Sequence, residues 1–133
     1  MPAGADRPLG PKILIVDHDE EGVQALARIL KLEGYSVQTA FTAEMGLYEA
    51  QLSQPDAIIL DFHMPLLDGL GFLRRLRAQA AQRATPVAII TGDYFLDDSL
   101  SNEIAKLGAE VAHKPLFSEQ ILGLARRLLE VTH

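Results

Sequence analysis

Three short runs of branched apolar residues constrain the fold of this chain more than any other feature of its sequence. They are "KILIV" (12–16), "DAIIL" (56–60) and "PVAII" (86–90), and a stretch with helical periodicity follows each run. Strands that are apolar at every position must be covered on both faces, which is typical of parallel strands joined by helices. The chain is therefore predicted to be an α/β protein built from strand–helix units.

The predicted helices are marked by apolar residues three or four positions apart. They span approximately 23–30, 43–52, 67–76, 100–107 and 121–128. Gly34 and Gly108 follow the first and fourth of these helices, where a C-terminal cap is expected. Two less apolar strands, at 35–40 and 109–113, complete a predicted set of five strands and five helices.

The order of the strands follows from which of them admit polar residues. The second and fifth strands contain Ser, Gln, Glu and His, so they are predicted to be the edges of the sheet. With right-handed crossovers, the order 2-1-3-4-5 places the apolar strands in the middle of a single doubly wound sheet. Ligands of such sheets bind beyond the carboxyl ends of the strands, between strands 1 and 3.

Composition excludes several classes of function. The 133 residues, 48% of them hydrophobic, suffice for one domain with a substantial core. The net charge is −6 and no run is rich in Lys or Arg, so direct nucleic-acid binding is disfavoured. The absence of cysteine excludes disulfides and thiolate chemistry. Because no segment has signal-peptide or membrane-spanning length, we expect a cytoplasmic protein with no membrane contact. Residues 1–11 are expected to be a flexible tail before a domain at 12–133.

Polar residues gather where the predicted strands end. They are Asp17, His18 and Asp19 after the first strand, Asp61 after the third, Thr91 after the fourth and Lys114 after the fifth. Asp19 stands where the first helix should start and is interpreted as a helix cap, as is Asp68 before the third helix. Capping does not explain why a lysine and a threonine should converge on a carboxylate. Asp61, Thr91 and Lys114 are therefore predicted to form a functional site.

The residue types of this site indicate its chemistry. Two carboxylates about 5 Å apart repel by roughly 3 kcal/mol at an effective dielectric near 20, so a crowded acidic site needs cations. Lys114 is one cation, and a divalent ion such as Mg²⁺, which accepts carboxylate and carbonyl oxygens, is the other. Together with a threonine hydroxyl, these groups suit a phosphoryl group in transfer, with a carboxylate as nucleophile. The predicted reaction is phosphoryl transfer to aspartate.

Four motifs, in this order and spacing, resemble the receiver domain of two-component response regulators. They are "ILIVDHDE", "LDFHMPLLDG", "AIITG" and "HKPL", and the resemblance extends from Lys12 to the end of the sequence. It implies a flavodoxin-like receiver fold and a phosphoacceptor regulator that assists its own phosphoryl transfer and dephosphorylation, not an enzyme. It also implies that Asp61 takes phosphate from a sensor histidine kinase or a histidine phosphotransfer protein.

The resemblance also assigns the other site residues. Asp17 and Asp61 would hold Mg²⁺ (or Mn²⁺) with the backbone carbonyl of His63, while Thr91 and Lys114 would contact the phosphoryl group. The Lys114-Pro115 bond is cis in the family, and an X-Pro bond is where a cis peptide costs least. His63 and Asp93 fall at positions that influence the lifetime of the phosphoryl group in relatives.

The sequence departs from the family pattern at His18. Receivers usually carry a second acid there as a direct metal ligand, and imidazole is a poorer partner for Mg²⁺ than a carboxylate. Several outcomes stay open: Asp17 and Asp61 suffice, Asp19 moves in, the site prefers Mn²⁺, or it binds metal weakly. A protonated His18 could also supply part of the positive charge. Weakened but surviving metal-dependent phosphorylation is the outcome we favour.

A second departure is Val111, three residues before Lys114, where the family commonly has a Tyr or Phe that changes rotamer. A two-position aromatic switch cannot operate with valine. The signal could still reach the surface of the helix at 100–107, the strand at 109–113 and the helix at 121–128, the usual output face, through which a homodimer could also form. Tyr94 and Phe95 in "DYFL" (93–96) are either a partner patch or an edge of the core.

Two alternatives are weighed against a working receiver. A degenerate receiver would act as a phosphorylation-independent protein-binding module, for which His18 and Val111 are the evidence. A haloacid-dehalogenase-like phosphatase would use Asp17 of "DHD" as its nucleophile, and "GDYFLD" (92–97) fits a later motif of that class. Its catalytic lysine precedes that motif, however, whereas Lys114 follows it. The cognate kinase, the downstream protein and whether the chain is a fragment stay open.

Overall fold

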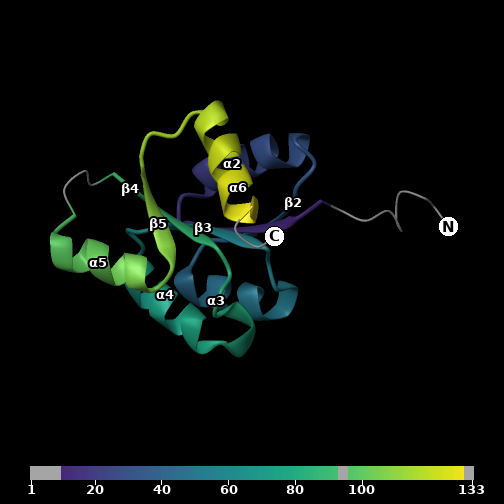
Figure 1. Cartoon of the computed structure of the whole chain (residues 1–133). Coiled ribbons are helices and arrows are strands. Elements are labelled where there is room, and N and C mark those ends of the chain that lie inside the picture. The colour runs from purple at the N-terminus through teal and green to yellow at the C-terminus, as the bar shows by residue number, and fades with distance from the viewer. Residues whose placement is uncertain (1–9, 93–95, 131–133) are drawn as a thin grey trace.

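The computed structural model describes residues 10–92 and 96–130 and contains one sheet of five parallel strands (Figure 1). The strands are β1 (Lys12–Val16), β2 (Ser36–Ala40), β3 (Ala57–Asp61), β4 (Val87–Thr91) and β5 (Ala109–His113). Their order is β2-β1-β3-β4-β5, which confirms the predicted order and edge strands. The predicted α/β class with a flavodoxin-like topology is therefore confirmed.

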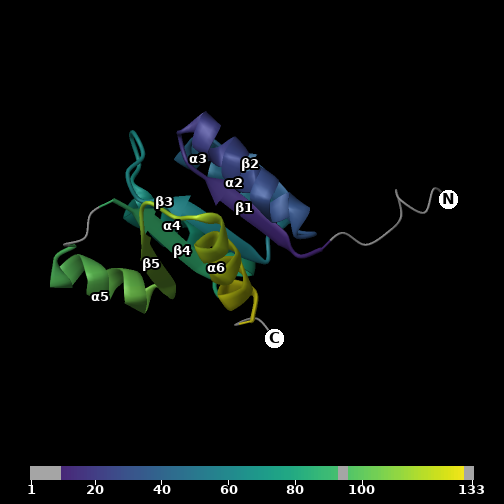
Figure 2. The ribbon, with the colours of Figure 1, turned by 90° about the horizontal axis from the view of Figure 1, so that it is seen from above.

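Helices cover both faces of this sheet. The helices are α2 (Glu20–Leu32), α3 (Ala43–Ser53), α4 (Gly69–Ala78), α5 (Asp98–Lys106) and α6 (Ser118–Glu130). Figure 1 shows α2 and α6 on one face and α3, α4 and α5 on the other. Seen from above in Figure 2, α5 lies beyond β5, at the far side of the molecule from β2.

The alternation of side chains along the central strands creates two cores. In β1, Leu14 and Val16 face the core under α3 and α4, whereas Ile13 and Ile15 face the core under α2 and α6. All four side chains are buried, because both faces of this inner strand are covered. This explains why the "KILIV" run has no alternation of apolar and polar residues.

Some predicted boundaries were wrong by one or two residues. Asp61 and Thr91 are the last residues of β3 and β4, not the residues after them. Leu67 was assigned to a helix, but α4 begins at Gly69, because the Asp68 carboxylate accepts a hydrogen bond from the Gly71 N–H at 2.9 Å. The Asp68 cap itself is confirmed.

One element was not predicted, the 3₁₀ helix η1 (Ala80–Gln82). Polar contacts rather than an apolar pattern hold it. The buried Gln82 side chain donates to the Ala50 carbonyl at 3.2 Å and accepts from the Thr85 hydroxyl at 2.6 Å. A buried glutamine is stable only when its amide is paired, and these partners are invisible in a hydrophobic pattern.

The predicted glycine caps are present, with positive φ at Gly34 (97°) and Gly108 (78°).

The expected N-terminal tail spans residues 1–11, of which 1–9 lie outside the described residues. Its last residue, Pro11, contacts the sheet, because the Pro11 carbonyl accepts a hydrogen bond from the Ser36 N–H at 3.0 Å. Within 10–92 and 96–130, no helix is both long and apolar enough to cross a lipid bilayer.

Candidate functional site

The carboxyl ends of β3, β4 and β5 bring the three predicted site residues to one end of the sheet. Asp61 ends β3 with its side chain only 2% exposed, and Thr91 ends β4 fully buried. Lys114 follows β5 directly, and its N–H donates to the Thr91 carbonyl at 2.8 Å. The Lys114-Pro115 bond is cis, as the resemblance implied.

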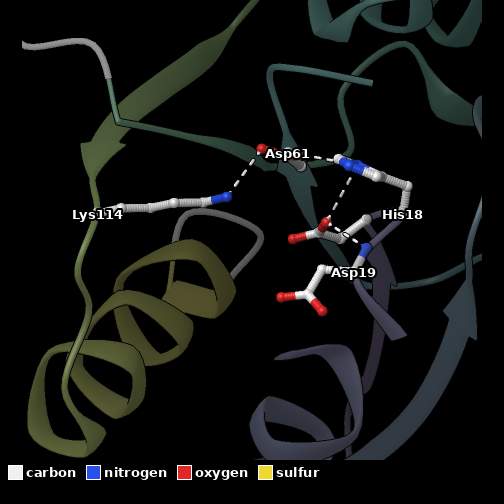
Figure 3. A network of polar contacts seen from close by, with 5 residues as sticks. His18, Asp19, Asp61 and Lys114 are labelled. Carbon is white, nitrogen blue, oxygen red and sulfur yellow. Dashed lines mark hydrogen bonds and ion pairs between the residues drawn. The ribbon is translucent and has the colours of Figure 1, made fainter. Parts of the chain in front are cut away.

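Lys114 pairs with the buried carboxylate of Asp61. Its Nζ donates to Asp61 Oδ1 at 3.2 Å across the end of the sheet (Figure 3). The register pairs Asp61 with Ile90, so Thr91 lies one residue further along the neighbouring strand. A carboxylate this deeply buried needs a charged or hydrogen-bonded partner, and Lys114 meets that need.

His18 stands between the two carboxylates of the site. Its Nδ1 lies 3.5 Å from Asp61 Oδ2 and 3.7 Å from Asp17 Oδ1. Figure 3 shows the imidazole on the side of Asp61 opposite to Lys114. Asp17, His18 and Asp61 each offer one metal-ligating atom, and these atoms all lie within 4.8 Å of one another. Of the two residues left open as a third ligand, His18 belongs to this cluster.

Asp19 has the predicted position but not the predicted hydrogen bond. It is the N-cap residue of α2, yet its side chain makes no capping hydrogen bond, so that part of the prediction was wrong. The carboxylate instead lies over Gly22, where a β carbon would be 2.6 Å from Asp19 Oδ2. In Figure 3 the Asp19 carboxylate points away from Asp61 and His18, and its backbone N–H donates to Asp17 Oδ1 at 3.0 Å.

His63, the source of a predicted backbone ligand, lies two residues beyond Asp61. Its side chain is exposed and packs edge-on against Phe62, with ring centroids 4.9 Å apart. The residues of the proposed "DYFL" patch that carry aromatic rings, Tyr94 and Phe95, lie outside the described residues, as does Asp93.

A cavity beside the site was not foreseen from the sequence. Its volume is about 460 Å³, and its walls include Leu26, Ile29 and Ile121. Asp17, Asp61 and Lys114 line it as well, so it adjoins the charged cluster. Its residues come from elements far apart in the chain, and no single run of the sequence marks such a space.

Burial raises the pKa of the Asp17 carboxyl. The hydrogen bond from the Asp19 N–H opposes this shift, and the nearby charge of Asp61 adds to it. The folded protein therefore binds the Asp17 proton more tightly than the unfolded chain, whose carboxyl has an ordinary pKa near 3.8. It follows that ionisation of Asp17 destabilises the fold, and that stability is lost as the pH rises through the raised pKa.

We expect the Asp17→Asn variant to stabilise the metal-free protein at neutral pH, because asparagine keeps an oxygen for the Asp19 N–H but carries no charge. Thermal unfolding of both proteins with a chelator, from about pH 3 to about pH 7, should show a gap in Tm that opens as the pH rises. A gap of the same size at both ends of this range would contradict the argument.

Comparisons with known proteins assign the chain to a family. The family model described as the response regulator receiver domain matches residues 13–125. The chain belongs to this family. All three residues of the polar cluster, Asp17, His18 and Asp61, and also Thr91 and Lys114, fall within the matched range.

Relatives of this receiver domain are found among both sequences and structures. Response regulator MprA of Mycobacterium avium is 36% identical over 124 residues, which cover 91% of this chain and 52% of that protein. Transcriptional regulatory protein PrrA of Mycobacterium leprae is 32% identical over 120 residues, which cover 90% of this chain and 50% of that protein. The chain thus spans about half the length of these curated relatives.

A solved structure extends the likeness to three dimensions. The chemotaxis protein CheY4 of Vibrio cholerae has a TM-score of 0.83 and 30% sequence identity, over 90% of this chain and 99% of that one. Membership of the receiver family favours a two-component signalling domain over the phosphatase alternative.

Val111, the second departure from the family pattern, is half-buried on β5 and packs against the core under α3, α4 and α5.

Proposed function

We propose that this receiver domain is a phosphoacceptor and that Asp61 takes the phosphoryl group from a phosphohistidine of a sensor histidine kinase or a histidine phosphotransfer protein. The observation that carries the proposal is the buried Asp61 carboxylate, which has a cationic amine 3.2 Å from one oxygen and an imidazole 3.5 Å from the other. A capping aspartate at a strand end would not need a lysine from the loop that follows another strand.

The chemistry of the transfer follows from these groups. An Asp61 oxygen attacks the phosphorus of the donor, a P–O bond forms, and the P–N bond of the phosphohistidine breaks. Lys114 offsets the negative charge of the phosphoryl oxygens, and the Thr91 hydroxyl donates a hydrogen bond to one of them. Because the Asp61 carboxylate is held by its surroundings before the donor arrives, little reorganisation is needed.

The residues present fit a divalent ion in part. Asp17 and Asp61 supply two carboxylates, as Mg²⁺ prefers, but the third ligating atom of the cluster is the His18 imidazole nitrogen. We infer that Asp17, Asp61 and the His63 carbonyl hold the ion, with His18 in place of the usual acid. When bound, the ion supplies positive charge to the phosphoryl oxygens.

The proposed output surface is formed by α5, β5 and α6. Arg74 of α4 forms an ion pair with Glu103 of α5, and Arg77 donates to the Leu107 carbonyl at 2.7 Å, next to the end of α5. These contacts tie α5 to α4. Phosphorylation would change the shape of this surface, and a downstream protein or a second copy of the chain would then bind it. Because residue 111 is a valine, this change would not involve the rotamer of an aromatic side chain at that position.

A degenerate receiver is the second candidate, and His18 and Val111 are the observations that favour it. Such a module would bind its partner through the same surface but would never carry phosphate. The intact set of Asp61, Thr91 and Lys114 favours the phosphoacceptor over this alternative.

The deciding experiment is phosphorylation of the protein by acetyl phosphate with Mg²⁺, Mn²⁺ and Zn²⁺, each supplied separately, followed by intact mass. We expect a phosphate adduct that the Asp61→Asn variant does not form, because asparagine keeps the shape of the side chain and lacks a nucleophilic carboxylate. A panel of histidine kinases would then identify the donor.

Two results would contradict the phosphoacceptor. No adduct with any of the three metals or with any kinase would support the degenerate module. An adduct that persists in Asp61→Asn but is lost in Asp17→Asn would support the phosphatase-like nucleophile.

A further inference from the structure

We infer that His18 is a metal ligand and that the cluster of Asp17, His18 and Asp61 selects a nitrogen-binding transition ion of the Zn²⁺ type over Mg²⁺. This inference deepens the proposed function and rests on it for the location of the metal. It concerns a residue type that the receiver pattern does not have at this position.

The spacing of the three ligating atoms is the first argument. His18 Nδ1 lies 3.5 Å from Asp61 Oδ2 and 3.7 Å from Asp17 Oδ1. Neighbouring ligands at about 2.0–2.2 Å from a tetrahedral ion such as Zn²⁺ are about 3.3–3.6 Å apart. Neighbouring ligands of octahedral Mg²⁺, at about 2.0–2.1 Å, are only about 3 Å apart. These two distances are nearer to the tetrahedral value, and all three ligating atoms lie within 4.8 Å of one another.

The chemistry of the donors is the second argument. Imidazole nitrogen suits Zn²⁺, Cu²⁺, Fe²⁺ and Ni²⁺, whereas Mg²⁺ favours carboxylate, carbonyl and water oxygens. Exchanging a carboxylate for imidazole removes a negative charge that Mg²⁺ needs and adds a nitrogen that later transition ions prefer. Both effects shift the selectivity of the site in the same direction.

The division of the Asp61 oxygens is the third argument. Lys114 Nζ contacts Oδ1, whereas His18 lies next to Oδ2, so the lysine and the imidazole address different oxygens. Figure 3 shows Lys114 and His18 on opposite sides of the Asp61 carboxylate. An ion held beside His18 therefore need not displace the ion pair with Lys114.

The orientation and access of the ligands complete the argument. The Asp17 carboxylate accepts a hydrogen bond from the Asp19 N–H at 3.0 Å. In metal sites, a hydrogen bond of this kind to a ligating carboxylate fixes the orientation of the ligand. The His18 side chain is 52% exposed, so an ion can reach it from solvent. Phosphorylation of Asp61 would then depend on the supply of transition metal.

The test is a calorimetric titration of the whole unphosphorylated chain with Zn²⁺, Mn²⁺ and Mg²⁺, each alone. In the wild type we expect Zn²⁺ to bind at least about 10-fold more tightly than Mg²⁺. The His18→Asp variant should bind Mg²⁺ about 10- to 100-fold more tightly and Zn²⁺ more weakly. The His18→Gln variant removes the nitrogen without adding charge, so it should lose Zn²⁺ affinity and gain no Mg²⁺ affinity.

A second readout follows the imidazole itself. Zn²⁺ should shift the ring resonances of His18 in NMR spectra, which are assigned by their absence in His18→Gln. Unchanged Zn²⁺ affinity in both variants, or equal affinity of the wild type for Zn²⁺ and Mg²⁺, would overturn the inference. These titrations involve no phosphoryl transfer, so their failure is distinct from absence of an adduct on Asp61, which would count against the proposed function instead.

Discussion

The Phe72→Ala variant is expected to lose about 3–5 kcal/mol of unfolding free energy, a large part of the total stability of about 5–15 kcal/mol of a domain. Phe72 lies on α4 with no exposed surface and is among the largest fully buried side chains. It packs so closely that a β carbon on Gly46 of α3 would lie 2.9 Å from Phe72 Cε2 and 2.8 Å from Val16 Cγ2. Removing the ring leaves a cavity where α3, α4 and β1 meet.

Urea denaturation at 25 °C would measure this loss as a lower midpoint with an unchanged slope. Phe117→Ala is the matched control, because the same truncation at a side chain that is 69% exposed should change stability by less than about 0.5 kcal/mol. Equal, small losses in the two variants would show that α3 and α4 do not pack as described.

The fold was predictable from the sequence to the extent that burial leaves a local pattern. The runs at β1, β3 and β4 are apolar because these strands are covered on both faces, and β2 and β5 admit polar residues because they are edges. The topology follows from these patterns together with the handedness of the crossovers.

Elements held by specific polar contacts were not predictable in this way. The 3₁₀ helix η1 depends on the contacts of Gln82 with Ala50 and Thr85, and the start of α4 depends on the Asp68 cap. The Asp68 cap was recognised, but the apolar Leu67 extended the helical pattern past it. A hydrophobic period records which face is buried, and it does not record where the first backbone amide is capped.

The candidate site was predictable because parallel strands end at the same edge of a sheet. That rule, applied to Asp61 and Lys114, anticipates a contact between residues 53 positions apart in the chain. It gives no side-chain orientation, so the sequence could not decide between His18 and Asp19. The structure separates them, because His18 faces both carboxylates while Asp19 lies over Gly22.

The Lys114→Met variant is expected to slow phosphorylation by acetyl phosphate by about 100-fold or more. Methionine keeps most of the apolar stem and removes the ammonium group that lies 3.2 Å from Asp61 Oδ1. Since the Asp61 side chain is only 2% exposed, water solvates it poorly and compensates only in part for the lost charge as the phosphoryl group arrives. Lys31→Met, at an exposed position in the last turn of α2, is the matched control and should leave the rate unchanged.

Metal titration of the same variant separates two causes of a slow rate. If Lys114 acts on the phosphoryl group, Lys114→Met should bind divalent ions at least as tightly as the wild type. The substitution removes a positive charge that repels the metal ion beside the carboxylates. A variant that is slow and has also lost its metal would show that Lys114 maintains the geometry of the carboxylates. A variant that is phosphorylated at the wild-type rate would remove Lys114 from the transfer and leave it as the charge partner of a buried aspartate.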